Sequence, residues 1–161
     1  MWLVEEMLRG LGLDINRVKN ELIARFQVDE KTAQEMYDWY DNLIEMMRME
    51  KVEQAGHIQV LRNDVNELTE LHFFLLHEVH DMRYQQIVSG AAMNLVEFRT
   101  KAGVGNEVSD VELALNALYG HLMLRLQKKE VSAQTLQAME AFGKMIGYLA
   151  ARYKKMEEEN K

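Results

Sequence analysis

Apolar residues recur at helical spacing along almost the whole chain, and this pattern predicts an all-helical protein. One clear stripe is formed by Met36, Tyr40, Leu43 and Met47, which follow one another at steps of three or four residues. Proline, which breaks helix interiors, is absent from the 161 residues. We therefore expect an all-α, single-domain helical bundle of about six helices, up-and-down-like, over residues 1–161.

Residues typical of helix ends divide this pattern into segments. Short polar side chains that can accept a bond from a first-turn amide mark the expected N-caps at Asp14, Asp29, Asp81, Ser109 and Ser132. The helices are expected at 1–9, 14–26, 29–54, 57–80, 81–100, 109–128 and from 132 on, with 157–161 as a frayed charged tail. The stripes expected to face inward include Phe26, Leu122, Leu126 and Leu136.

Composition narrows the class of protein. Apolar residues make up 48% and charged residues 28%, which is typical of globular chains. The absence of cysteine excludes disulfides, thiolate catalysis and cysteine-ligated metals. No apolar run is long enough to span a membrane and no basic leader opens the chain, so we expect a soluble, cytoplasmic protein.

The net charge of −7 is unevenly distributed. Residues 1–80 have 8 Lys and Arg against 16 Asp and Glu, whereas residues 81–161 have 11 against 10. The basic clusters, residues 128–129 and 152–155, are too short for the basic stripe typical of nucleic-acid binders. We therefore expect no nucleic-acid partner.

No motif points to catalysis or to a cofactor. The serines are few, and Ser109 and Ser132 already serve as expected caps, so a nucleophile–histidine–acid triad has few candidates. No histidine follows a glutamate by three positions, as a di-iron bundle requires. His77 and His80 share a helix face and are weak metal candidates, but we expect no metal, no cofactor and, on balance, no enzyme.

Three polar residues stand on otherwise apolar stripes: His72, Arg99 and Arg125. Buried polar groups need hydrogen-bond partners, and buried charges need to be paired. In one interpretation His72 makes a core hydrogen bond while the arginines extend to the surface from helix ends. In the other, the three side chains converge on a polar pocket between helices that binds a small anionic ligand.

Self-association is indicated by residues that suit helix–helix interfaces. Trp39 falls beside the main stripe of its helix, where a half-exposed tryptophan often anchors a contact. Gly143 and Gly147 put small residues on one face of the last helix, which lets a neighbouring backbone approach. We therefore expect a homo-oligomer, most simply a homodimer, with a further protein partner as an open alternative.

Three segments resemble a known family. They are residues 38–47 (DWYDNLIEMM), residues 56–72 with Gly56-His57 and Leu71-His72, and residues 117–132 with Leu124-Arg125-Leu126-Gln127-Lys128-Lys129. The chain is similar over nearly its whole length to an uncharacterised all-helical family from Bacteroidetes bacteria, a domain of unknown function. The resemblance implies a cytoplasmic bacterial protein and brings no activity. It also implies a proline break near residues 80–85, where this chain has only Asp81, so one continuous bent helix is the alternative there.

The function we expect from the sequence is therefore a non-catalytic interaction or scaffold protein that self-associates through helix faces. The alternative is a small anionic-ligand-binding protein or enzyme with a pocket near His72, Arg99 and Arg125.

Overall fold

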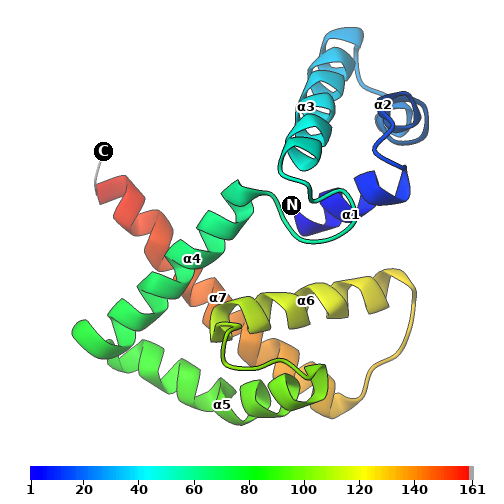
Figure 1. The fold of residues 1–161 in the computed structure, drawn as a ribbon. Helices are drawn as coiled ribbons and strands as arrows, with labels where there is room; N and C mark the ends of the chain where they lie inside the picture. The colour runs from blue at the N-terminus through cyan, green and yellow to red at the C-terminus, as the bar shows by residue number, and fades with distance from the viewer. Residues whose placement is uncertain (160–161) are drawn as a thin grey trace. The chain divides into compact units, whose positions relative to one another are not determined.

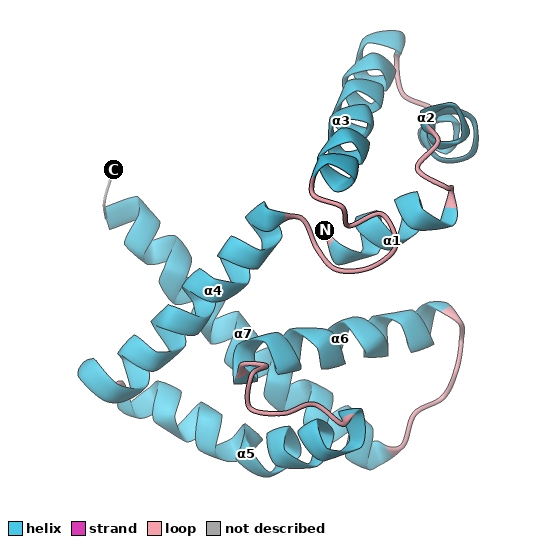
Figure 2. Ribbon diagram, viewed as in Figure 1, coloured by secondary structure: helices cyan, strands magenta, loops and turns pink. Residues whose placement is uncertain are grey.

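A computed structural model describes residues 1–159 of the chain. These residues form seven α-helices and no strand, so the expectation of an all-α fold is confirmed, with seven helices in place of about six (Figure 2). The chain divides into two compact units, residues 1–63 and 64–161. The single domain over residues 1–161 stays a prediction.

The first unit contains α1 (Trp2–Gly10), α2 (Ile15–Arg17), α3 (Glu30–Met49) and the start of α4 (Gln59–Phe73). A π-helical turn, Val18–Leu22, and a 3-10 turn, Ile23–Phe26, continue α2 without interruption. Leu8, Val18, Ile44 and Met47 are at most 1% exposed and form the centre of this unit's core.

The second unit contains the rest of α4, a π-helical turn (Phe74–Glu78), α5 (Met82–Ala102), α6 (Asp110–Leu126) and α7 (Ala133–Glu159). Helices α5, α6 and α7 pack against one another (Figure 1). Their core includes Tyr84, Leu113, Phe142 and Leu149, each at most 1% exposed.

The expected N-caps are confirmed. Asp14, Asp29, Asp81, Ser109 and Ser132 each accept a hydrogen bond from a backbone amide of the first helical turn. The Asp81 cap separates α4 and its π turn from α5, so residues 57–100 are not one continuous bent helix. A glycine in the left-handed region, Gly103 with φ 66°, ends α5 in the expected loop.

Three expectations about helix ends and faces were wrong. Helix α3 ends at Met49 and not near residue 54, because Lys51 takes a left-handed conformation and turns Val52 into the core. Phe26, Leu122, Leu126 and Leu136 are 53%, 38%, 58% and 50% exposed, because the core of each unit takes other faces of their helices. Residues 157–159 of the expected frayed tail belong to α7, and residues 160–161 lie outside the described residues.

Candidate functional site

His72, which the sequence placed on an apolar stripe, lies in the core of the second unit. Its side chain is 4% exposed and its Nδ1 atom is 2.8 Å from the hydroxyl of Tyr84, which is itself fully buried. Burial lowers the pKa of His72, partly offset by the nearby charge of Asp110, because the charged imidazolium is poorly solvated there. Burial likewise raises the pKa of the Tyr84 phenol. His72 thus makes one hydrogen bond within the core, which is what the first of the two interpretations predicted.

Arg99 holds together the loop between α5 and α6. Its guanidinium donates to the backbone carbonyls of Gly105 and Val108, the latter at 2.7 Å, and to the Asp110 carboxylate at 2.8 Å. The Arg99 side chain is 18% exposed. A guanidinium has five N–H donors, and the bonds made here from Nη1 and Nη2 are to the loop and to Asp110 at the start of α6.

Two of the three residues of the expected anion pocket, Arg99 and His72, interact with the same carboxylate, that of Asp110. Asp110 pairs with Arg99 and acts electrostatically on His72. Arg125 is exposed in the last turn of α6, roughly 22 Å along the helix axis from Asp110 at 1.5 Å per residue. Arg125 therefore does not converge with His72 and Arg99.

The weak metal candidates lie at the break before α5. His77 stacks on Phe73, and His80 takes a left-handed φ of 52° in the connection. The neighbouring Asp81 accepts bonds from the Tyr84 amide and from the Tyr148 hydroxyl at 2.8 Å, which together lower its pKa. Within residues 1–159, no group of three His, Asp or Glu side chains is arranged to hold a metal ion.

A buried carboxylate in the first unit was missed by the sequence analysis. Glu5 of α1 is 0% exposed and accepts hydrogen bonds from the Ile58 amide at 3.0 Å and from Nδ1 of His57 at 2.6 Å. Trp2 stacks on the His57 ring at 4.5 Å. Glu5 stands between Trp2 and Leu8 at helical spacing, so the rule that singled out His72, a polar residue on an apolar stripe, would also have found it.

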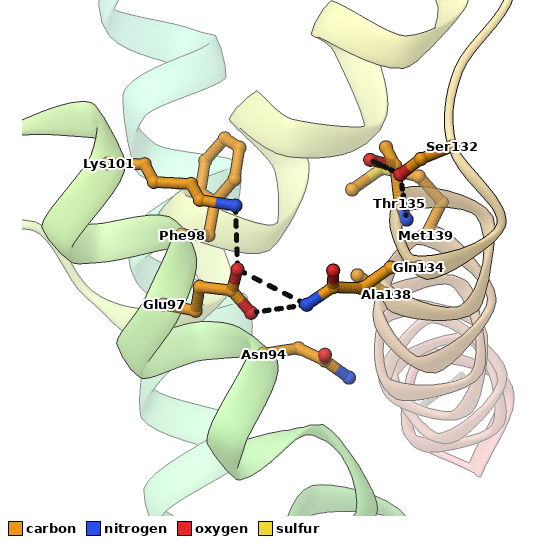
Figure 3. Close-up of a pocket in the computed structure, with 9 residues that line it drawn as sticks. All are labelled: Asn94, Glu97, Phe98, Lys101, Ser132, Gln134, Thr135, Ala138 and Met139. Atoms are coloured by element: carbon orange, nitrogen blue, oxygen red, sulfur yellow. Dashed lines mark hydrogen bonds and ion pairs between the residues drawn. The ribbon is translucent and has the colours of Figure 1, made fainter.

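A pocket lies between α5 and α7 in the second unit (Figure 3). Its volume of 210 Å³ is below the range of about 300–1,000 Å³ typical of small-ligand sites. The carboxylate of Glu97 at its edge already accepts from Lys101 at 2.6 Å and from Gln134 at 3.2 Å, and the Lys101 ammonium lowers the pKa of Glu97. A groove of 470 Å³ follows between the same two helices, lined in part by Gly90 and Ala141. These hollows are shallow furrows between helices and not an enclosed ligand site.

The outer face of α5 is uncharged and uncovered. Met82, Met93 and Val96 are 75%, 81% and 64% exposed. Together with three exposed polar residues they form a stripe at alternating steps of four and three residues, which we call the α5 stripe: Met82, Gln86, Ser89, Met93, Val96 and Thr100. The spacing, though not the full apolar composition, is that of the a and d positions in helices that pair along their length.

The residues expected at an interface are also exposed. Trp39 on α3 is 46% exposed and packs edge-on against Tyr40 with ring centroids 4.9 Å apart. Gly143 and Gly147 lie on an exposed face of α7, where an added Cβ atom would meet nothing within 4 Å. Their small size is therefore not needed by packing within the chain. None of the described helices is both long and apolar enough to cross a membrane.

Comparison with known proteins identifies a family without assigning an activity. The model of the family described as a domain of unknown function (DUF4924) matches residues 1–160, and the chain belongs to this family. Searches of curated proteins and of solved structures found no match.

Proposed function

We propose that this member of a family of unknown function is a non-catalytic interaction or scaffold protein that self-associates through helix faces, most simply as a homodimer. The observation behind the proposal is the α5 stripe. Two large side chains, Met93 and Met82, are at least 75% exposed there, and the stripe contains no charged residue that would oppose a second copy. Exposed apolar surface of this kind is typical of interaction sites.

The α5 stripe suits a symmetric contact with a second copy. Two copies of α5 side by side would place the same uncharged face on both partners, as a two-fold interface requires. Ser89, Gly90 and Ala92 near the middle of the helix leave room for close approach. The stripe covers 18 residue steps, roughly 27 Å of helix at 1.5 Å per residue. A contact of this length belongs with interfaces below about 1,200 Å², which are weak and transient, so we expect micromolar association.

The alternative function, an anionic-ligand site near His72, Arg99 and Arg125, has less support. His72 is bonded to Tyr84, Arg99 is bonded to its own loop, and Arg125 lies apart from both. The absence of cysteine supports placing the protein in the cytoplasm, and the resemblance in its motifs supports a bacterial, Bacteroidetes origin.

The test is the mass of the purified protein by native mass spectrometry and sedimentation at micromolar concentration. Met93→Lys should lower the mass of the oligomer, because a lysine on each copy adds like charges to the α5 contact. Met49→Lys is the matched control, since Met49 is 82% exposed on α3 and outside the stripe. A wild-type protein that is monomeric throughout, or an oligomer that Met93→Lys leaves unchanged, would contradict the α5 contact. A retained small molecule in the mass spectrum would favour the anionic-ligand alternative.

A further inference from the structure

A second groove in the second unit combines an apolar floor with an acidic rim. It lies between the end of α4 with its π turn and the last turns of α7, two helices that cross each other (Figure 1). The Tyr153 hydroxyl of α7 donates to the Glu67 carboxylate of α4 and joins the two walls. The groove has a volume of 460 Å³ and is lined by Glu67, Glu70, Leu71, Phe74, Glu78, Tyr153 and Met156.

The floor and the rim of this groove differ in chemistry. Phe74 and Met156 are each 42% exposed and offer apolar surface. Glu67, Glu70 and Glu78 surround them, and within residues 1–159 no Lys or Arg forms an ion pair with any of the three. The bond to Glu67 raises the pKa of Tyr153 to about 12, so the phenol keeps its proton at neutral pH. The groove therefore matches an occupant that presents apolar side chains together with several cations.

One exposed segment of this same chain has that composition. The end of α6 and the connection after it, which we call the basic corner, comprise residues 122–129. Leu122 and Leu126 are 38% and 58% exposed one helical turn apart, and Arg125, Lys128 and Lys129 are exposed beside them. No described acidic residue forms an ion pair with these three cations. Lys128 takes a left-handed φ of 55°, which ends the helix and turns the corner.

The basic corner of one chain cannot reach the acidic groove of the same chain. The corner precedes α7 at Ala133, whereas the groove is formed by Tyr153 and Met156 near the other end of that helix. Twenty residues of helix separate the two ends by roughly 30 Å at 1.5 Å per residue. An occupant with this chemistry must therefore come from another molecule.

We propose that the acidic groove binds the basic corner of a second copy of this chain, with Leu122 and Leu126 over Phe74 and Met156 and the cations facing the carboxylates. Because the two surfaces differ, the contact is head-to-tail and repeats from copy to copy, giving rings or filaments. The inference rests on the proposed self-association, but it uses surfaces separate from the α5 stripe. It would make the protein a scaffold whose assembly depends on salt.

Two charge-reversed variants test the contact. One carries Glu70→Lys and Glu78→Lys in the groove, and the other carries Lys128→Glu and Lys129→Glu in the corner. Both also carry Met93→Lys, which disrupts the α5 contact. Any association that remains must then come from another contact. We expect each variant alone to be monomeric. Mixed in equal amounts they should associate again, because the intact corner of the first meets the intact groove of the second and the two reversed surfaces are also opposite in charge.

The parent for this comparison is Met93→Lys with both surfaces intact. We expect its mass, followed by sedimentation, to rise with concentration. Raising salt from about 0.1 M to about 1 M, which shortens the screening length from about 10 Å to about 3 Å, should weaken its association about tenfold or more. A monomeric parent, unchanged self-association in either variant, or a mixture that stays monomeric would overturn the proposal.

Two other results would distinguish the head-to-tail contact from the α5 contact and from a contact with another protein. If Met93→Lys abolishes all association and the mixture is monomeric, the α5 contact stands and the head-to-tail contact is refuted. If a free peptide of residues 122–131 binds the wild-type chain but not the groove variant while the mixture stays monomeric, the groove belongs to a basic segment of another protein. That result would also overturn the inference.

Discussion

The buried Glu5 carboxylate provides the sharpest test of how the first unit is held together. It accepts hydrogen bonds from the Ile58 amide and the His57 ring, the two residues that directly precede α4. Ile58 is 1% exposed, so Glu5→Ala leaves a buried amide without an acceptor, at a cost of about 1–3 kcal/mol. The bond from His57 is lost as well, but that side chain is 31% exposed and can be rehydrated. We expect a total loss of about 3 kcal/mol, within the range measured when one partner of a buried pair is removed.

Two further substitutions make this prediction quantitative. Glu5→Gln keeps an oxygen acceptor for the Ile58 amide and loses only the charge facing His57, so it should cost about 1 kcal/mol. Glu6→Ala is the matched control, because its neighbouring carboxylate is 48% exposed and pairs with Arg9 at the surface. An exposed pair of this kind contributes about 0–1 kcal/mol.

The assay is urea unfolding followed by tryptophan fluorescence. Both tryptophans of the chain, Trp2 and Trp39, belong to the first unit, so their emission reports on that unit. For a unit of this size the slope in urea is about 1 kcal/mol per molar, so Glu5→Ala should lower the midpoint by about 3 M or leave the unit unfolded in water. Equal midpoints for Glu5→Ala and Glu6→Ala would refute the reasoning.

Two other predictions concern the second unit's core and the end of α3. The lowered pKa of His72 means that the unfolded chain binds its proton more readily, so the stability that His72 contributes is complete above about pH 6.5 and falls below it. The melting temperature of His72→Gln should therefore lie furthest below that of the wild type at neutral pH. The difference between the two melting temperatures should be smaller near pH 5. At the end of α3, Lys51→Gly should stabilise the protein by about 0.5–1 kcal/mol, because glycine takes a φ of 59° without the penalty of a side chain.

These two predictions have their own contradicting outcomes. In the first, the melting temperatures of His72→Gln and the wild type differ by the same amount from pH 7.5 to pH 5. Such a constant difference would show that protonation of His72 does not affect folding. Lys31→Gly is the control for Lys51→Gly, since it lies inside α3 and should destabilise by about 1 kcal/mol. If both glycines lower the melting temperature alike, the left-handed backbone at Lys51 is not a source of strain.

The candidate site could be predicted from sequence only in part. A polar residue on an apolar stripe identified His72 as buried, but the stripe contained no information about Tyr84 as its partner. Arg99 was expected either to extend to the surface or to line a ligand pocket, and its actual acceptors include the carbonyls of Gly105 and Val108 in its own loop. The two exposed patches, the α5 stripe and the acidic groove, depend on which helix faces the core leaves uncovered, and so required the tertiary structure.

The sequence by itself determined the helical class, the five N-caps and the break at Asp81. These features follow from interactions within about four residues, such as a cap side chain and a first-turn amide, which are present in any fold. Only the tertiary structure decided that α3 stops at Met49, that Glu5 is buried against His57, and that Leu126 is exposed. Each of these depends on segments that are distant in the chain, 52 residues for Glu5 and His57, and the meeting of such segments is decided by packing and not by local preference.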